Sequence, residues 1–136
     1  MKKDPARLLR RALRANAAFS AATGGLLIAL PGRWAAVFGP PYPAAYAALG
    51  SALLAFAAVV AWASRDIARR RTLVGAIVAA DGLWVLATPV VMAGGRAAIG
   101  GTGHALLAGT GAAVAILAGL QWHGLRASRS RAAAQE

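Results

Sequence analysis

One acidic residue, Asp81, stands in the middle of an apolar run that covers residues 72–93. A carboxyl group at the centre of a membrane helix costs about 2.5–3.5 kcal/mol on insertion scales, so it needs a compensating role. Burial in hydrocarbon favours the neutral form, and we expect Asp81 to be protonated unless a cation or water reaches it. Such a group can exchange protons, coordinate a cation in a small transporter, or join two helices by a hydrogen bond.

Several side chains are candidates to contact this carboxyl. Trp84 follows Asp81 by one helical turn and could pack over it or donate its indole N–H. Hydroxyl groups in the other apolar runs are possible hydrogen-bond partners: Ser20, Thr23, Ser51 and Thr110. A single carboxyl without a second charged partner makes a poor proton relay, so the sequence favours a structural hydrogen bond over proton transfer.

Other reactive combinations have little support. The chain has no cysteine, which excludes disulfides, thiolate metal sites and cysteine nucleophiles. His104 and His123 lie near opposite ends of one predicted helix, about 28 Å apart, too far to share a metal or haem. A haem or quinone module would need one of these histidines to pair with another chain. Gln121 and His123 are instead expected at the inner membrane interface, where polar side chains meet lipid headgroups. The glycine-rich residues 93–103 lack the lysine and the strand of a phosphate loop. We expect no enzyme activity, cofactor or metal site.

The composition is typical of an integral membrane protein. Of the 136 residues, 59% are hydrophobic and 14% are charged, and a soluble domain this small could not bury so much apolar surface. The net charge of +11 would indicate nucleic-acid binding in a soluble protein. Here the basic residues form short clusters between apolar runs, so topology and anionic lipid headgroups explain them better, and we expect no nucleic-acid partner.

The apolar runs predict an all-α membrane protein, a bundle of four transmembrane helices in a domain of residues 15–126. The predicted spans match the hydrocarbon thickness and cover residues 15–38, 44–64, 72–93 and 104–125. Residues 1–14 are expected to form a basic interfacial helix, and residues 127–136 a basic cytoplasmic tail. Pro31 should bend or break the first span near its outer end, and Pro89 should kink the third.

The basic residues are distributed unevenly between the two sides of this bundle. Thirteen of the 15 lysines and arginines lie in residues 1–14, in the connector at residues 65–71 and in residues 126–136, whereas Arg33 and Arg96 stand alone in the other two connectors. The positive-inside rule therefore predicts that both termini are cytoplasmic. Eight arginines are predicted to contact lipid headgroups or a partner: Arg7, Arg10, Arg11, Arg14, Arg69, Arg70, Arg71 and Arg126.

Three stretches of the chain carry a family resemblance: LRRALRANAAFSAATGGLLIALPG, SALLAFAAVVAW with the glycine before it, and VAADGLWVLATPVVM. The most specific pieces are RANA at residues 14–17, FS at residues 19–20, and Asp81 with the WVL of residues 84–86. They resemble a family of small bacterial inner-membrane proteins that have four spans and no assigned activity. The resemblance covers roughly residues 8–126 and implies a multi-pass protein of the bacterial plasma membrane.

Two functions remain from these observations. The sequence favours a non-enzymatic structural or accessory subunit that packs in a homo-oligomer or in a larger membrane complex. The alternative is a small proton- or cation-coupled transporter that uses Asp81. The transporter predicts a water-accessible cavity that reaches the carboxyl and loss of transport in Asp81→Asn, whereas a dry, fully packed site would count against it.

Overall fold

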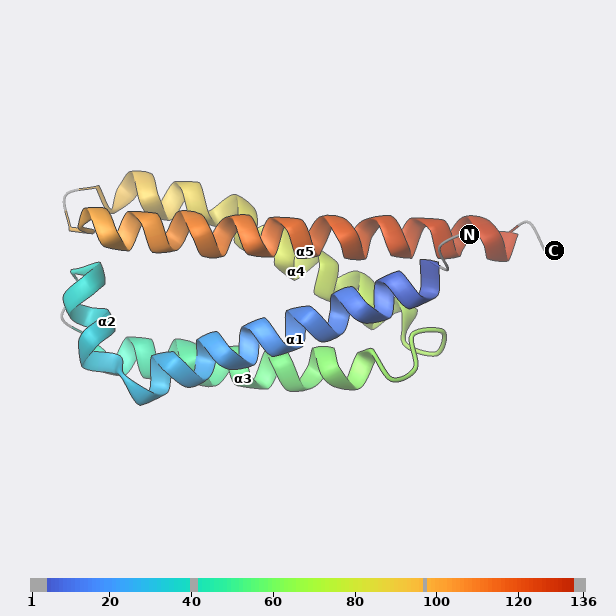
Figure 1. Ribbon diagram of the computed structural model, residues 1–136, viewed down its shortest axis with the longest axis horizontal. Helices are drawn as coiled ribbons and strands as arrows, with labels where there is room; N and C mark the ends of the chain where they lie inside the picture. Colours follow the sequence, from blue (N-terminus) through green and yellow to red (C-terminus); the bar gives the residue numbers. More distant parts are fainter. Residues whose placement is uncertain (1–4, 40–41, 97, 134–136) are drawn as a thin grey trace.

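The computed structural model describes residues 5–39, 42–96 and 98–133, and within these ranges it contains five helices and no strand (Figure 1). Three helices are long and apolar enough to span a membrane, and the first two helices add a fourth span if their bent pair counts as one. In chain order, the helices are α1 (Pro5–Ala29), α2 (Pro31–Phe38), α3 (Pro43–Ala63), α4 (Arg71–Gly94) and α5 (Gly101–Ala133).

α1 begins before the span predicted for it, and α5 ends after the span predicted for it. Residues 5–14 do not form a separate interfacial helix, because they are the first turns of α1, where Leu9 and Leu13 are fully buried. Likewise α5 continues through residues 127–133, which were expected to be a tail. Hydropathy marks where apolar surface ends, but a helix continues until a residue breaks it. In contrast, α3 and α4 begin and end within one residue of the predicted spans.

The chain turns sharply at Pro31, as predicted. α2 runs at 95° to α1, because proline has no N–H to continue the hydrogen bonds of α1 and its ring clashes with the preceding turn. Leu30 leaves the helical conformation with φ −132° and ψ 47°, and Pro31 then takes the first position of α2, where the missing N–H has no cost. The indole of Trp34 spans the corner, its Nε1 donating to Leu26 O at 2.9 Å.

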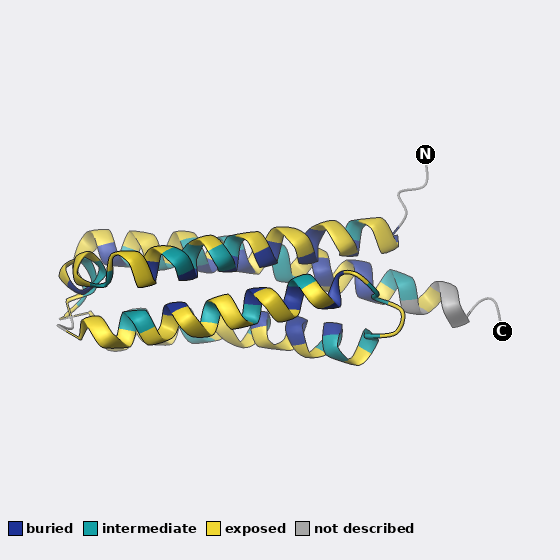
Figure 2. Ribbon diagram, turned by 90° about the horizontal axis from the view of Figure 1, so that it is seen from below, coloured by how far each residue is buried: buried dark blue, intermediate teal, exposed yellow. Residues whose placement is uncertain are grey.

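One end of the bundle is tightly packed. This end, called the packed end below, holds the start of α1, the end of α5 and the α3–α4 connector, whereas α2 and the α4–α5 connector lie at the opposite end, the α2 end (Figure 1). Buried positions concentrate toward the packed end (Figure 2). The core cluster there draws on four helices and consists of Leu9, Leu13, Ala17, Val60, Ala63, Val74, Ile77 and Leu125.

Close backbone contacts set the helix positions. α1 packs along α3 and α5, and α4 packs along α5, whereas α3 and α4 contact each other much less. α1 and α3 cross where two glycines meet, since a Cβ on Gly24 would lie 2.7 Å from Gly50 O. α1 approaches α5 as closely at another glycine, because a Cβ on Gly124 would lie 2.9 Å from Leu9 Cβ. Small residues allow the helix backbones to approach this closely. In lipid the hydrophobic effect does not drive helices together, so the van der Waals contacts of such close approaches stabilise the bundle.

Candidate functional site

Asp81 joins three helices at the border between the packed end and the rest of the bundle. The residue lies on α4 and is only 5% exposed. Asn16 Nδ2 on α1 donates to Asp81 Oδ2 at 2.6 Å, and Gln121 Nε2 on α5 donates to the same oxygen at 3.0 Å. The second oxygen, Oδ1, accepts no hydrogen bond from the part of the chain that the structure describes. Two donors on one oxygen suit an ionised carboxylate, which can only accept.

The same side chains also accommodate a protonated carboxyl. Gln121 is fully buried, and its Oε1 has no hydrogen-bond partner among the described residues. The nitrogen and oxygen of an amide occupy equivalent positions, so a half-turn of the amide places Oε1 beside Asp81 as an acceptor. Asp81 can then donate its proton to Gln121. The site therefore provides a hydrogen bond to the carboxyl in either charge state.

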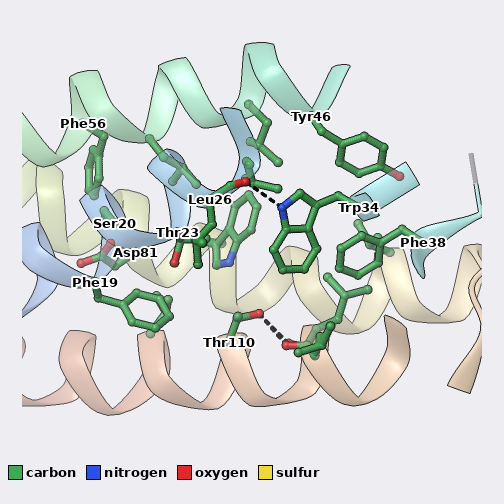
Figure 3. Close-up of a pocket in the computed structure, with 18 of the residues that line it drawn as sticks. Phe19, Ser20, Thr23, Leu26, Trp34, Phe38, Tyr46, Phe56, Asp81 and Thr110 are labelled. Atoms are coloured by element: carbon green, nitrogen blue, oxygen red, sulfur yellow. Dashed lines mark hydrogen bonds between the residues drawn. The ribbon is translucent and has the colours of Figure 1, made fainter. Parts of the chain in front are cut away.

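A cavity of about 580 Å³ begins at Asp81 and extends toward the α2 end. All five helices contribute to its lining, and Figure 3 shows side chains from several of them converging on the same space. Most of the lining is apolar or aromatic. Among the described residues that line the cavity, none is a lysine, arginine or histidine, and Asp81 is the only one with a carboxyl group. The cavity is therefore mostly apolar, with the acidic group Asp81 at the end that is nearer the packed end.

Aromatic rings line the α2 end of this cavity. Trp34 and Phe38, one turn apart on α2, stack with ring centres 6.0 Å apart and planes inclined at 22°. Phe38 stacks in turn on Tyr46 of α3, with ring centres 6.0 Å apart and planes inclined at 20°. The 95° turn at Pro31 brings these rings over the cavity, because a straight helix would have carried Trp34 and Phe38 away from it.

The residues predicted around Asp81 are only partly its neighbours. Thr23, Trp84 and Thr110 line the same cavity, but none of the expected hydroxyls donates to the carboxyl. Thr110 Oγ1 donates to Leu106 O and exposed Ser51 donates to Ala47 O, both at 2.9 Å. Hydroxyl side chains on a helix readily reach a carbonyl one turn back, which satisfies them within their own helix.

Sequence reasoning missed both amides that hold Asp81. Asn16 belongs to the RANA stretch that carries the family resemblance, and the sequence does not mark it as a partner of Asp81. Its Oδ1 accepts a long hydrogen bond of 3.4 Å from Ser20. The expectation that Gln121 lies at the inner interface is wrong, because Gln121 is fully buried and α5 continues to Ala133. An amide inside an apolar run is the signal that could have identified them, since a buried polar group needs a partner.

The two histidines do not approach each other in the structure. His104 lies at the α2 end, where its Nδ1 and Nε2 are each 3.2 Å from a carbonyl oxygen, those of Gly100 and Met92. His123 is exposed near the packed end. Among the residues that the structure describes, no three His, Asp or Glu side chains gather in a way that could hold a metal ion.

The arginines predicted to contact lipid or a partner lie at the packed end. Arg70 lies over the exposed ring of Trp62, its guanidinium carbon 3.7 Å from the ring centre, and its Nη1 donates to Trp62 O at 2.7 Å. Arg126 lies 5.4 Å from the ring centre of exposed Trp122. Exposed tryptophans paired with cations are typical of the boundary between bilayer and water. The other six are Arg7, Arg10, Arg11, Arg14, Arg69 and Arg71.

No family model, curated protein or solved structure matches this chain. The function is therefore inferred from the cavity and from Asp81.

Proposed function

We propose that this protein is a small membrane carrier that binds a partly apolar molecule in the cavity and uses Asp81 as its proton- or cation-responsive group. The cavity of about 580 Å³ that reaches the carboxyl carries this proposal. Its volume lies in the range of roughly 300–1,000 Å³ that is usual for small-molecule sites. If the only role of the carboxyl were to join helices, a filled site would be more stable, because empty space loses van der Waals packing contacts.

The hydrogen bonds of Asp81 couple the cavity to the helix packing. Asp81 lines the cavity on one side and accepts bonds from α1 and α5 on the other. A change of charge at Asp81 therefore alters the bonds that hold three helices together. A carrier needs such a link between its binding site and its helix packing. A ligand can shift a conformational equilibrium only by interacting differently with the two conformations of the protein.

The proposal includes an orientation. The start of α1, the end of α5 and the α3–α4 connector lie at the packed end, with most of the basic residues, which supports a cytoplasmic position for this end in a bacterial plasma membrane. The natural chain has no cysteine, so single-cysteine variants can test the orientation. A membrane-impermeant maleimide added to intact cells should label Ala98→Cys and leave Ala68→Cys unlabelled.

Transport in vesicles tests the carrier directly. Proteoliposomes with an imposed pH gradient would be offered fluorescent amphiphiles of similar size that are cationic, neutral or anionic. We expect uptake of at least one class by the natural protein and loss of that uptake in Asp81→Asn. Ser51→Ala is the matched control, because this exposed hydroxyl bonds only within its own helix. Uptake that persists in Asp81→Asn, or no uptake of any class, would contradict the proposal.

An accessory role is the second candidate, and the uncovered face of α4 favours it. Leu83, Leu86 and Val90 are spaced along one side of this helix and are 68%, 71% and 71% exposed. Lipid or a partner helix covers such a face in a membrane. Native mass spectrometry after extraction in mild detergent separates the two cases. A larger partner bound in fixed proportion would support an accessory subunit, whereas monomers or homo-oligomers alone would leave the carrier.

A further inference from the structure

The charge pattern of the cavity restricts what it can bind. Of the lining residues that the structure describes, Asp81 is the only acidic one, and none has a cationic side chain to offset it. The groups that face Asp81 from α1 and α5 are the amides of Asn16 and Gln121, which do not titrate. Tyr46 is the one other titratable residue in the described part of the lining, and it lies in the aromatic stack at the α2 end. An anionic ligand would meet a carboxyl without a countercharge, whereas a cation would supply it.

The rest of the lining fits an apolar or aromatic body. Aromatic side chains from four helices line the cavity, and most of them are labelled in Figure 3: Phe19, Trp34, Phe38, Tyr46, Phe56 and Trp84. Ring faces attract cations, and the attraction grows where water is excluded. Rings of this kind also offer large contact areas to an apolar ligand. The lining therefore favours positive charge through two independent features, the carboxyl and the rings.

We propose that the ligand of this cavity is a lipophilic cation, a molecule with an apolar body and one positive charge, which exchanges with a proton on Asp81. This inference rests on the proposed carrier function and names its substrate class. Before the exchange, the carboxyl carries a proton and donates it to Gln121 Oε1, after a half-turn of the amide from its orientation in the structure. When the cation enters, the O–H bond of Asp81 breaks, the proton passes to water, and the carboxylate pairs with the ligand. The Gln121 amide turns back, and its Nε2 donates to Oδ2 as the structure shows.

Two ions of nearly the same shape and opposite charge test this proposal. Tetraphenylphosphonium and tetraphenylborate would each be titrated into the purified natural protein in detergent, with binding corrected for empty micelles. We expect the phosphonium ion to bind and to release one proton per ion bound in weakly buffered solution. The borate ion should bind at least about tenfold more weakly, because the two ions share their apolar contacts and differ in their interaction with the carboxyl.

Variants of the chain make the test specific to the site. Asp81→Asn should weaken phosphonium binding by about tenfold or more and abolish proton release, whereas Ser51→Ala should change neither. Proton release by the natural protein needs no variant, so it remains a valid test if Asp81→Asn folds poorly. Equal binding of the two ions, or phosphonium binding without proton release, would overturn the inference.

The two proposals fail in different ways. If a neutral amphiphile is carried in an Asp81-dependent manner and the phosphonium ion does not bind, the carrier stands and the cationic substrate class is wrong. If the phosphonium ion binds with proton release but no amphiphile crosses the vesicle membrane, the ligand class stands and the carrier function is wrong.

Discussion

A methyl group added at Gly24 should push α1 away from α3. The added Cβ would lie 2.7 Å from Gly50 O and 3.1 Å from Leu53 Cβ, whereas ordinary contact begins near 3.4 Å. The helices would have to separate by about half an ångström or more, and overpacking of this kind costs about 1–3 kcal/mol. The change from glycine to alanine also favours the helix by about 0.5–1 kcal/mol, so a control must carry the same gain.

Gly25→Ala is that control. It lies next to Gly24 on α1, and a Cβ there would meet nothing within 4 Å. Because both variants gain the same helix propensity, the difference between their free energies of unfolding isolates the overpacking cost, about 1–3 kcal/mol. Reversible unfolding in mixed micelles, followed by circular dichroism, measures this difference. Equal stability of Gly24→Ala and Gly25→Ala would refute the contact between the α1 and α3 backbones.

Two further changes probe the site and the corner. Gln121→Leu removes one donor from Asp81 Oδ2 and should lower the free energy of unfolding by about 0.5–1.5 kcal/mol. His123→Leu, at an exposed neighbouring position, is its control, and an equal loss in both would contradict the buried bond. Trp34→Phe keeps a ring for the stack but loses the bond to Leu26 O, so it should cost about 0.5–1.5 kcal/mol. Trp34→Leu should lose more stability in the same unfolding assay, and equal losses would show that the stack contributes nothing.

Much of the fold follows from the sequence alone. Backbone groups in hydrocarbon must bond within their own segment, so an apolar run of the right length becomes a helix whatever packs against it. This is why α3 and α4 match their predicted limits so closely. The effect of Pro31 also depends only on local geometry, because its missing N–H and fixed backbone angle end α1 in any surroundings. The basic clusters likewise predict which ends of the helices lie together.

Local sequence patterns did not predict the limits of a helix that continues beyond its apolar stretch, as α1 and α5 do. Residues 5–14 carry four arginines and still belong to α1, because Leu9 and Leu13 share a face that packs into the core. Arginine and alanine are good helix formers, so neither residues 5–14 nor residues 127–133 contain a reason to stop. Hydropathy measures the fit to lipid, and tertiary packing decided how far these helices continue.

The sequence by itself determined that a carboxyl, Asp81, would lie inside a helix long and apolar enough to span a membrane, and that it would need a partner. Only the tertiary structure decided that the partners are amides from residues 65 and 40 positions away in the chain. The choice depends on the rotation and depth of each helix, which are set by contacts between distant residues such as Gly24 with Gly50. Alanine and glycine occur throughout this chain, so no local pattern marks which of them touch. The same contacts leave the space between Asp81 and α2 unfilled, and that cavity supports the chemical role proposed for the carboxyl.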